Sequence, residues 1–208
     1  MKKKLMILCI ALSLALAAPS FAAPTIIDLD GDEFTGVSGN YTYTTPPLGS
    51  IKFDGEIMTP GLWVDTEMVT AGSTGNVFDV IAANTWVTLT FDFSDGFQVT
   101  DVSFIYGGNA DRIIIEAWDD SSIPIMLASL DASTGNGASA GPVTWYAGSG
   151  NSIKTLRWKD PGGSNPELLY NFAALDNISI TVIPAPGAIL LGSIGVGFVG
   201  WLRRRRTL

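Results

Sequence analysis

The chain has 208 residues, with 12 lysines and arginines against 20 aspartates and glutamates, no histidine, and a single cysteine at position 9. Residues 23–183 therefore cannot supply a Ser-His-Asp triad, a cysteine nucleophile, a disulfide, or a zinc site with histidine or cysteine ligands. This stretch holds all 20 acidic residues and only five basic ones, a formal charge of −15 that argues against nucleic-acid binding.

Residues 1–22 have the order of a secretory signal peptide. Three lysines at positions 2–4 form a positive start, residues 5–17 form an apolar run, and Ser20-Phe21-Ala22 provides the small-x-small pattern before a cleavage point. We predict that the chain is exported and cut after Ala22. Cys9 lies within the apolar run and is interpreted as an ordinary small apolar residue of the signal.

Residues 23–183 show the period-two alternation of β-strands. In residues 85–93 the apolar side chains of Val87, Leu89 and Phe91 share one face, and threonines occupy the other. The next strand loses this phase near Thr100, which predicts a β-bulge. In chain order, the predicted strands are residues 25–29, 41–45, 51–53, 62–65, 76–81, 85–93, 97–106, 112–118, 125–130, 142–146, 153–158 and 174–182; residues 132–141 are predicted to be a surface loop.

Many short strands and no long helical period predict an all-β domain, a β-sandwich or jelly roll, over residues 23–183. The last strand, with Leu175-Asp176-Asn177-Ile178, and the segment 102–107 resemble strands of galactose-binding-like jelly rolls. This resemblance implies sugar binding in loops at one end of the sandwich and a structural calcium ion.

Alternating carboxylates near the start of the domain form a candidate calcium site. Asp28, Asp30 and Asp32 supply the oxygen ligands that calcium prefers, and Asp176 on the last strand completes the candidate set. The spacing does not fit an EF-hand loop, because Glu33 and Gly39 stand where that loop needs glycine and glutamate. The alternative is a solvated acidic edge with no bound metal.

Tryptophan and tyrosine side chains are the candidate carbohydrate contacts, because an indole face can pack against the C–H face of a sugar ring. The better exposed candidates are Trp145 and Tyr146, beside the glycine-rich loop, and Trp158, between Arg157 and Lys159. Trp86 and Trp118 lie within predicted strands and are expected in the core. Core or half-core packing is the favoured interpretation for each of these residues, and sugar contact is the alternative.

Catalysis by this chain would need a pair of carboxylates, because glycoside hydrolysis is the main chemistry left open without histidine or cysteine. The spacing of the five glutamates marks no such pair. We therefore expect a protein that is not an enzyme.

The C-terminal segment has three parts: Pro184-Ala185-Pro186, an apolar run over residues 187–202, and four arginines at positions 203–206. The apolar run predicts a transmembrane helix, and the arginines are expected to stay on the cytoplasmic side. A helix of 16 residues spans roughly 24 Å at about 1.5 Å per residue, which is less than the roughly 30 Å of a bilayer core. The predicted span is therefore short.

This three-part order resembles the Pro-Glu-Pro (PEP-CTERM) sorting signals of bacterial surface proteins, over about the last 25 residues. The resemblance implies a sorting motif of Pro184, Ala185, Pro186 and Gly187, orientation by Arg203, Arg204, Arg205 and Arg206, and cutting by an exosortase, a membrane protease-transpeptidase, in bacteria that make exopolysaccharide. The chain departs from the family pattern at Ala185, where the family has glutamate. The alternative is a plain membrane anchor that is never cut.

The sequence thus predicts an exported surface or extracellular-matrix protein, held at the cytoplasmic membrane with its domain outside and then sorted to the envelope or matrix. The predicted partners are the membrane, an exosortase-like enzyme and an exopolysaccharide. The first alternative is an anchored carbohydrate-binding module, and the second is a secreted glycoside-active enzyme.

Overall fold

A computed structural model describes residues 23–37, 39–58, 77–80, 84–94, 96–107, 112–132, 140–148, 150–161 and 173–185, and six single positions from 195 to 204. The predicted signal peptide, the strand predicted at 62–65 and most of the predicted span 187–202 lie outside these residues. The described positions of that span, such as Phe198 and Trp201, are helical. Within the described residues no helix has the length and apolar character needed to cross a membrane.

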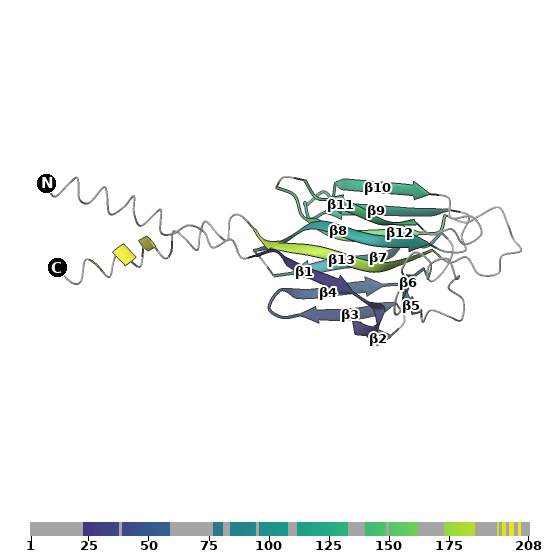
Figure 1. Ribbon diagram of the computed structural model, residues 1–208, viewed down its shortest axis with the longest axis horizontal. Coiled ribbons are helices and arrows are strands. Elements are labelled where there is room, and N and C mark those ends of the chain that lie inside the picture. Colours follow the sequence, from purple (N-terminus) through teal and green to yellow (C-terminus); the bar gives the residue numbers. More distant parts are fainter. Residues whose placement is uncertain are drawn as a thin grey trace, which may run out of the picture.

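The described part of the chain folds into two antiparallel sheets that face each other, as predicted for an all-β sandwich (Figure 1). The six-stranded sheet has the order β11-β8-β13-β6-β5, with β1 also paired to β13, and the seven-stranded sheet has the order β10-β9-β12-β7-β4-β3-β2. The strands of the six-stranded sheet are β1 (Thr25–Leu29), β5 (Glu56–Met58), β6 (Val77–Asp79), β8 (Phe97–Gly107), β11 (Ala140–Tyr146) and β13 (Ala174–Pro184). Those of the seven-stranded sheet are β2 (Thr35–Val37), β3 (Asn40–Thr45), β4 (Gly49–Asp54), β7 (Val87–Phe93), β9 (Ile113–Asp119), β10 (Met126–Ala132) and β12 (Ile153–Lys159).

The alternation in the sequence sets which side chains face the core. Along β7 the residues Val87, Leu89 and Phe91 are buried, and the threonines between them are half-buried on the outer side. The bulge predicted near Thr100 is confirmed, because the β13 partners pass from Asp101 directly to Val99. Part of the predicted loop 132–141 is wrong: Ala140 and Gly141 open strand β11.

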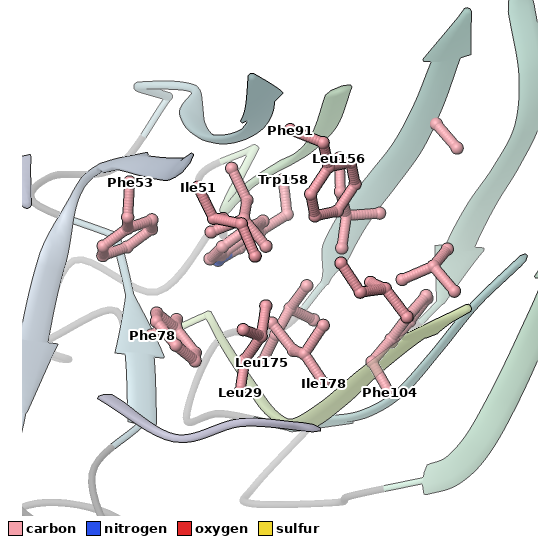
Figure 2. Close-up of a cluster of buried hydrophobic side chains, with 14 of the residues drawn as sticks. Leu29, Ile51, Phe53, Phe78, Phe91, Phe104, Leu156, Trp158, Leu175 and Ile178 are labelled. Carbon is pink, nitrogen blue, oxygen red and sulfur yellow. The ribbon is translucent and has the colours of Figure 1, made fainter. Parts of the chain in front are cut away.

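The core fills the space between the sheets (Figure 2). The six-stranded sheet contributes buried Leu29, Phe78, Phe104, Leu175 and Ile178. The opposite sheet contributes buried Ile51, Phe53, Phe91, Leu156 and Trp158. Aromatic rings join the two layers, because Phe53 of β4 meets Phe78 of β6 edge to face, with centroids 5.1 Å apart.

Strand β13 runs to the predicted sorting motif. Its register reaches Pro184 opposite Phe97, and the backbone N–H of Ala185 donates to the carbonyl of Gly96 at 2.6 Å. The first two residues of the motif are therefore half-buried: Pro184 ends strand β13, and Ala185 is hydrogen-bonded to the sheet. Proline lacks an N–H, but the carbonyl of Pro184 and the N–H of Ala185 can still pair with an antiparallel neighbour.

Candidate functional site

The outer face of the seven-stranded sheet carries the tryptophan–arginine cluster, which we define as Trp86, Glu116, Trp118, Arg157 and Lys159. Each of these side chains is half-buried. They come from β9, from β12, and from the residue just before β7, three strands that are neighbours in the sheet. The cluster is therefore built across strands that lie far apart in the sequence.

The guanidinium of Arg157 is within cation–π distance of both indoles. Its Cζ lies 4.3 Å from the ring centroid of Trp86 and 4.6 Å from that of Trp118. The carboxylate of Glu116 accepts from Arg157 Nε at 2.8 Å and Nη2 at 2.6 Å, and from the indole Nε1 of Trp118 at 2.9 Å. Glu116 thus fixes the position of the cation and of one ring.

Sheet register explains why these residues meet. Arg157 pairs with Glu116 of β9 on one side and with Thr88 of β7 on the other. Residues opposite each other in an antiparallel pair point to the same face. Because Leu156 and Trp158 point into the core, Arg157 and Lys159 point outward, where the half-buried indoles lie.

All five basic residues of the domain lie on the seven-stranded sheet or one residue before β9. Four of them form ion pairs: Lys52 and Lys154 with Asp92, Arg112 with Asp131, and Arg157 with Glu116. Lys52 holds the pKa of the Asp92 carboxyl below its usual range, by hydrogen bonding and by its charge. The ammonium of Lys159 lies 4.8 Å from the centroid of Trp86. This face therefore differs in charge from the strongly acidic rest of the domain.

The cluster combines flat apolar surface with donors and acceptors on a rigid sheet. The guanidinium covers a face of each indole, and the parts of these half-buried side chains that stay exposed offer apolar surface for the C–H groups of a ligand. Arg157, Glu116 and Lys159 carry donors and acceptors for hydroxyls. This is the kind of arrangement that binds a polyhydroxylated ligand with apolar faces.

Two of the predicted carbohydrate contacts lie on the other sheet. Tyr146 is 72% exposed, which agrees with its predicted exposure. Trp145 is half-buried and packs edge to face on Phe104, with centroids 5.0 Å apart. Sugar binding by this pair stays a prediction.

Trp158 is a core residue, which confirms the favoured interpretation of core packing and excludes it as an exposed sugar contact, whereas the core placement of Trp86 and Trp118 is wrong. Trp158 is 0% exposed, stacks on Phe53 with centroids 5.6 Å apart, and donates its Nε1–H to the carbonyl of Ala173 at 3.1 Å. Its place follows from the alternation in β12, which puts it on the same face as Leu156. The sequence of β9 does indicate that Trp118 faces outward. Trp118 lies two residues after the charged Glu116 and therefore on the same face of the strand.

The four predicted calcium ligands are not brought together. Asp28 is exposed on β1, and Asp30 caps the 3₁₀ turn η1 (Gly31–Glu33) by accepting from the N–H of Asp32 at 3.2 Å. Asp176 is instead buried in β13. Across the described ranges no group of three or more acidic side chains is arranged to hold a metal ion. Calcium binding stays a prediction.

Two other carboxylates are buried: Asp79 ends β6 of the six-stranded sheet, and Asp160 directly follows β12 of the seven-stranded sheet. Asp79 and Asp160 are 1% and 0% exposed. Burial raises the pKa of Asp79 well above its usual range; the N–H of Val80, which donates to its Oδ1 at 2.7 Å, opposes this shift, and the charges of Glu56 and Asp160 add to it. Asp79 Oδ2 has no hydrogen-bond partner among the described residues. Burial and the neighbouring acids therefore favour the uncharged form of Asp79.

Comparisons with known proteins gave structural likenesses only. No protein-family model and no curated protein sequence matches this chain. A variant of a family 29 carbohydrate-binding module is similar at 11% identity, covering 76% of this chain and 91% of that chain, with a TM-score of 0.34. A family 4 module is similar at 14% identity, 76% and 86% coverage and a TM-score of 0.29. A family 11 module from Clostridium thermocellum, in complex with a β-1,3-1,4-mixed-linked tetrasaccharide, is similar at 16% identity, 79% and 98% coverage and a TM-score of 0.31. These likenesses carry no argument about the function of this chain.

Proposed function

We propose that this chain is an exported, non-enzymatic surface protein whose β-sandwich binds polysaccharide at the tryptophan–arginine cluster. The observation that supports this proposal is the position of the Arg157 guanidinium within 4.3 and 4.6 Å of two half-buried indoles on an outer sheet face. The exposed parts of these indoles that the guanidinium does not cover offer a sugar chain apolar surface, next to the hydrogen-bonding groups of Arg157, Glu116 and Lys159.

Export and attachment follow from the two ends of the sequence. The signal-like residues 1–22 direct the domain outside, and the apolar run 187–202 with its four arginines holds it at the membrane. Exosortase-type sorting at Pro184 to Gly187 then places the domain in the envelope or matrix, where polysaccharide is its ligand.

Isothermal titration calorimetry with the exopolysaccharide of the host and with soluble β-glucans tests the binding. We expect Trp86→Ala and Trp118→Ala each to weaken binding about tenfold or more, because removing an aromatic contact costs roughly 1.5–3 kcal/mol. Tyr146→Ala is the matched control, an exposed aromatic residue on the opposite sheet, and should bind like the parent protein.

Three results would change this proposal. If both tryptophan variants lower the melting temperature but bind like the parent, the cluster is structural. If only Tyr146→Ala weakens binding, the sugar site is the one predicted from sequence at Trp145 and Tyr146. Release of reducing sugar from a glucan during the titration would instead favour a glycoside-active enzyme.

A further inference from the structure

The sandwich has a tail end, which we define by the three residues that meet where β13 finishes: Gly96, Asp120 and Ala185. All three line one cavity of about 220 Å³. The hydrogen bond from the Ala185 N–H to Gly96 holds the chain to the sheet up to this point. Only Pro186 separates this bonded residue from the predicted span 187–202.

Exposed apolar side chains gather near this tail end. We define the apolar rim as Ile26, Ile123, Ile125, Met126 and Tyr146, which are all exposed in the described structure. Ile123 is 80% exposed and follows Asp120 by three residues. Strand β10, which begins at Met126, starts at the end of the sandwich where β13 finishes (Figure 1).

The loop that carries Ile123 and Ile125 is held in place by Asp119. The carboxylate of Asp119 accepts from the N–H of Ile125 and from the hydroxyl of Ser121, each at 2.7 Å. The N–H of Asp119 in turn donates to the carbonyl of Ile125 at 3.0 Å. The two isoleucines are thus presented outward by an ordered loop, with their apolar surface in solvent.

The other two rim residues belong to one row of the six-stranded sheet. Ile26 pairs with Thr181, Thr181 pairs with Asp101, and Asp101 pairs with Tyr146. Thr181 precedes Pro184 by three residues, which is about 10 Å along a strand at roughly 3.3 Å per residue. Ile26 and the amphipathic Tyr146 therefore lie about 10 Å from the tail end, somewhat more than the roughly 5–8 Å depth of one headgroup layer, and they reach this layer when the tail end is drawn into it.

The short predicted span indicates that a lipid surface is the partner that fits the apolar rim. A 16-residue helix is roughly 6 Å shorter than a bilayer core, and a short span is accommodated by thinning the bilayer or by drawing its flanking residues inward. Because the chain is hydrogen-bonded to the sheet up to Ala185, Pro186 is the only linker residue between the sandwich and the predicted span. Such a short linker keeps the sandwich close to the lipid.

We propose that the tail end lies on the outer surface of the lipid bilayer, with the apolar rim in its interfacial layer. This proposal rests on the membrane tail of the proposed function, and its partner is the lipid surface itself. The loop at Ile123 carries aspartates and no basic residue, so the contact is apolar and does not depend on anionic lipids. The tryptophan–arginine cluster, on a side of the sandwich, stays free for polysaccharide.

Site-specific fluorescence in vesicles tests this contact. The full chain with Cys9→Ser carries one new cysteine, at Ile123→Cys, labelled with an environment-sensitive dye and reconstituted into phosphatidylcholine vesicles with a lipid-borne quencher. Val37→Cys is the matched control: Val37 is 74% exposed and lies in the β2–β3 hairpin, away from the tail end. We expect blue-shifted, quenched emission for the label at 123 and neither change at 37, with the same result at high salt.

Each other outcome has a separate meaning. If the protein stays with the vesicles but the label at 123 behaves like the label at 37, the rim does not contact lipid and the proposed anchoring stands. If the protein does not stay with the vesicles, both the proposed membrane anchoring by the tail and the proposed lipid contact of the rim are wrong. A blue shift at 123 that is lost in high salt would show an electrostatic contact and overturn the apolar one.

Discussion

At the scale of single residues, side chains of one chemical type have opposite roles because burial differs. Trp158 is a core residue between the sheets, whereas Trp86 and Trp118 face outward beside Arg157. Asp28 is solvated, whereas Asp79 is buried next to other acids. Residue type alone therefore does not separate a ligand contact from a packing residue in this protein.

Asp79 should make the stability of the domain depend on pH. Because its pKa is raised on folding, the folded state binds more protons than the unfolded state above about pH 4, so stability falls as pH rises towards the raised pKa. Asp79→Asn keeps an oxygen for the N–H of Val80 and removes the charge. We expect its melting temperature at pH 7 to exceed that of the parent by about 2–4 °C, for about 1 kcal/mol, and to match it near pH 4. A difference that grows on acidification, measured by calorimetry, would contradict this account.

At the scale of elements, a glycine at the start of β4 determines how closely β4 and β7 approach each other. Gly49 opens β4 with a φ of 141° opposite Phe93 of β7. A Cβ built there would lie 2.4 Å from the carbonyl oxygen of Asp92 and 2.8 Å from the Cα of Phe93. The pairing of β4 with β7 therefore requires glycine at this position.

Gly49→Ala should consequently separate these two strands. We expect a loss of more than about 2 kcal/mol and a fall in melting temperature of at least about 5 °C, since backbone atoms cannot move aside cheaply. Gly148→Ala is the control, because Gly148 also has a positive φ, 78°, but no described atom within 4 Å of an added Cβ. It should cost only about 1–2 kcal/mol. Equal melting temperatures for the two variants would show that the strands adapt to the added methyl group.

At the scale of the whole molecule, the proposed binding face and the proposed membrane contact lie on different parts of one rigid sandwich. The cluster is on the outer face of the seven-stranded sheet, and the rim residues lie at the end of the sandwich where β13 finishes. The net charge of −15 on residues 23–183 repels anionic surfaces generally, so both contacts depend on local apolar and hydrogen-bonding groups.

Processing of the tail is tested on the protein from its own host by intact-mass and C-terminal peptide mapping. We expect a C-terminus between Pro184 and Gly187, because the three-part tail resembles an exosortase signal. Ala185→Glu restores the glutamate of the family pattern and should raise the processed fraction. If both proteins end at Leu208, the tail is a plain anchor.

The sequence by itself determined the all-β class, most strands and the two faces of each strand. The bounds of β1 were predicted at Thr25–Leu29, and the bulge at Thr100 followed from a break in alternation. The three-residue strands β2 and β5 were missed, because such short segments show no period. The charge of the domain and the absence of histidine could also be read directly.

Only the tertiary structure decided which strands are neighbours, and with them the candidate site. Alternation divides β12 into two faces, but burial of Trp158 and exposure of Arg157 depend on which face meets the other sheet. Arg157 meets Trp86 and Trp118 through pairing of strands that are distant in the chain. The apolar rim arises in the same way, because β1 pairs with the last part of β13 and β10 of the other sheet starts at the same end of the sandwich. Local sequence does not determine which distant strands pair, since the free energy that selects this pairing comes from burying the shared core.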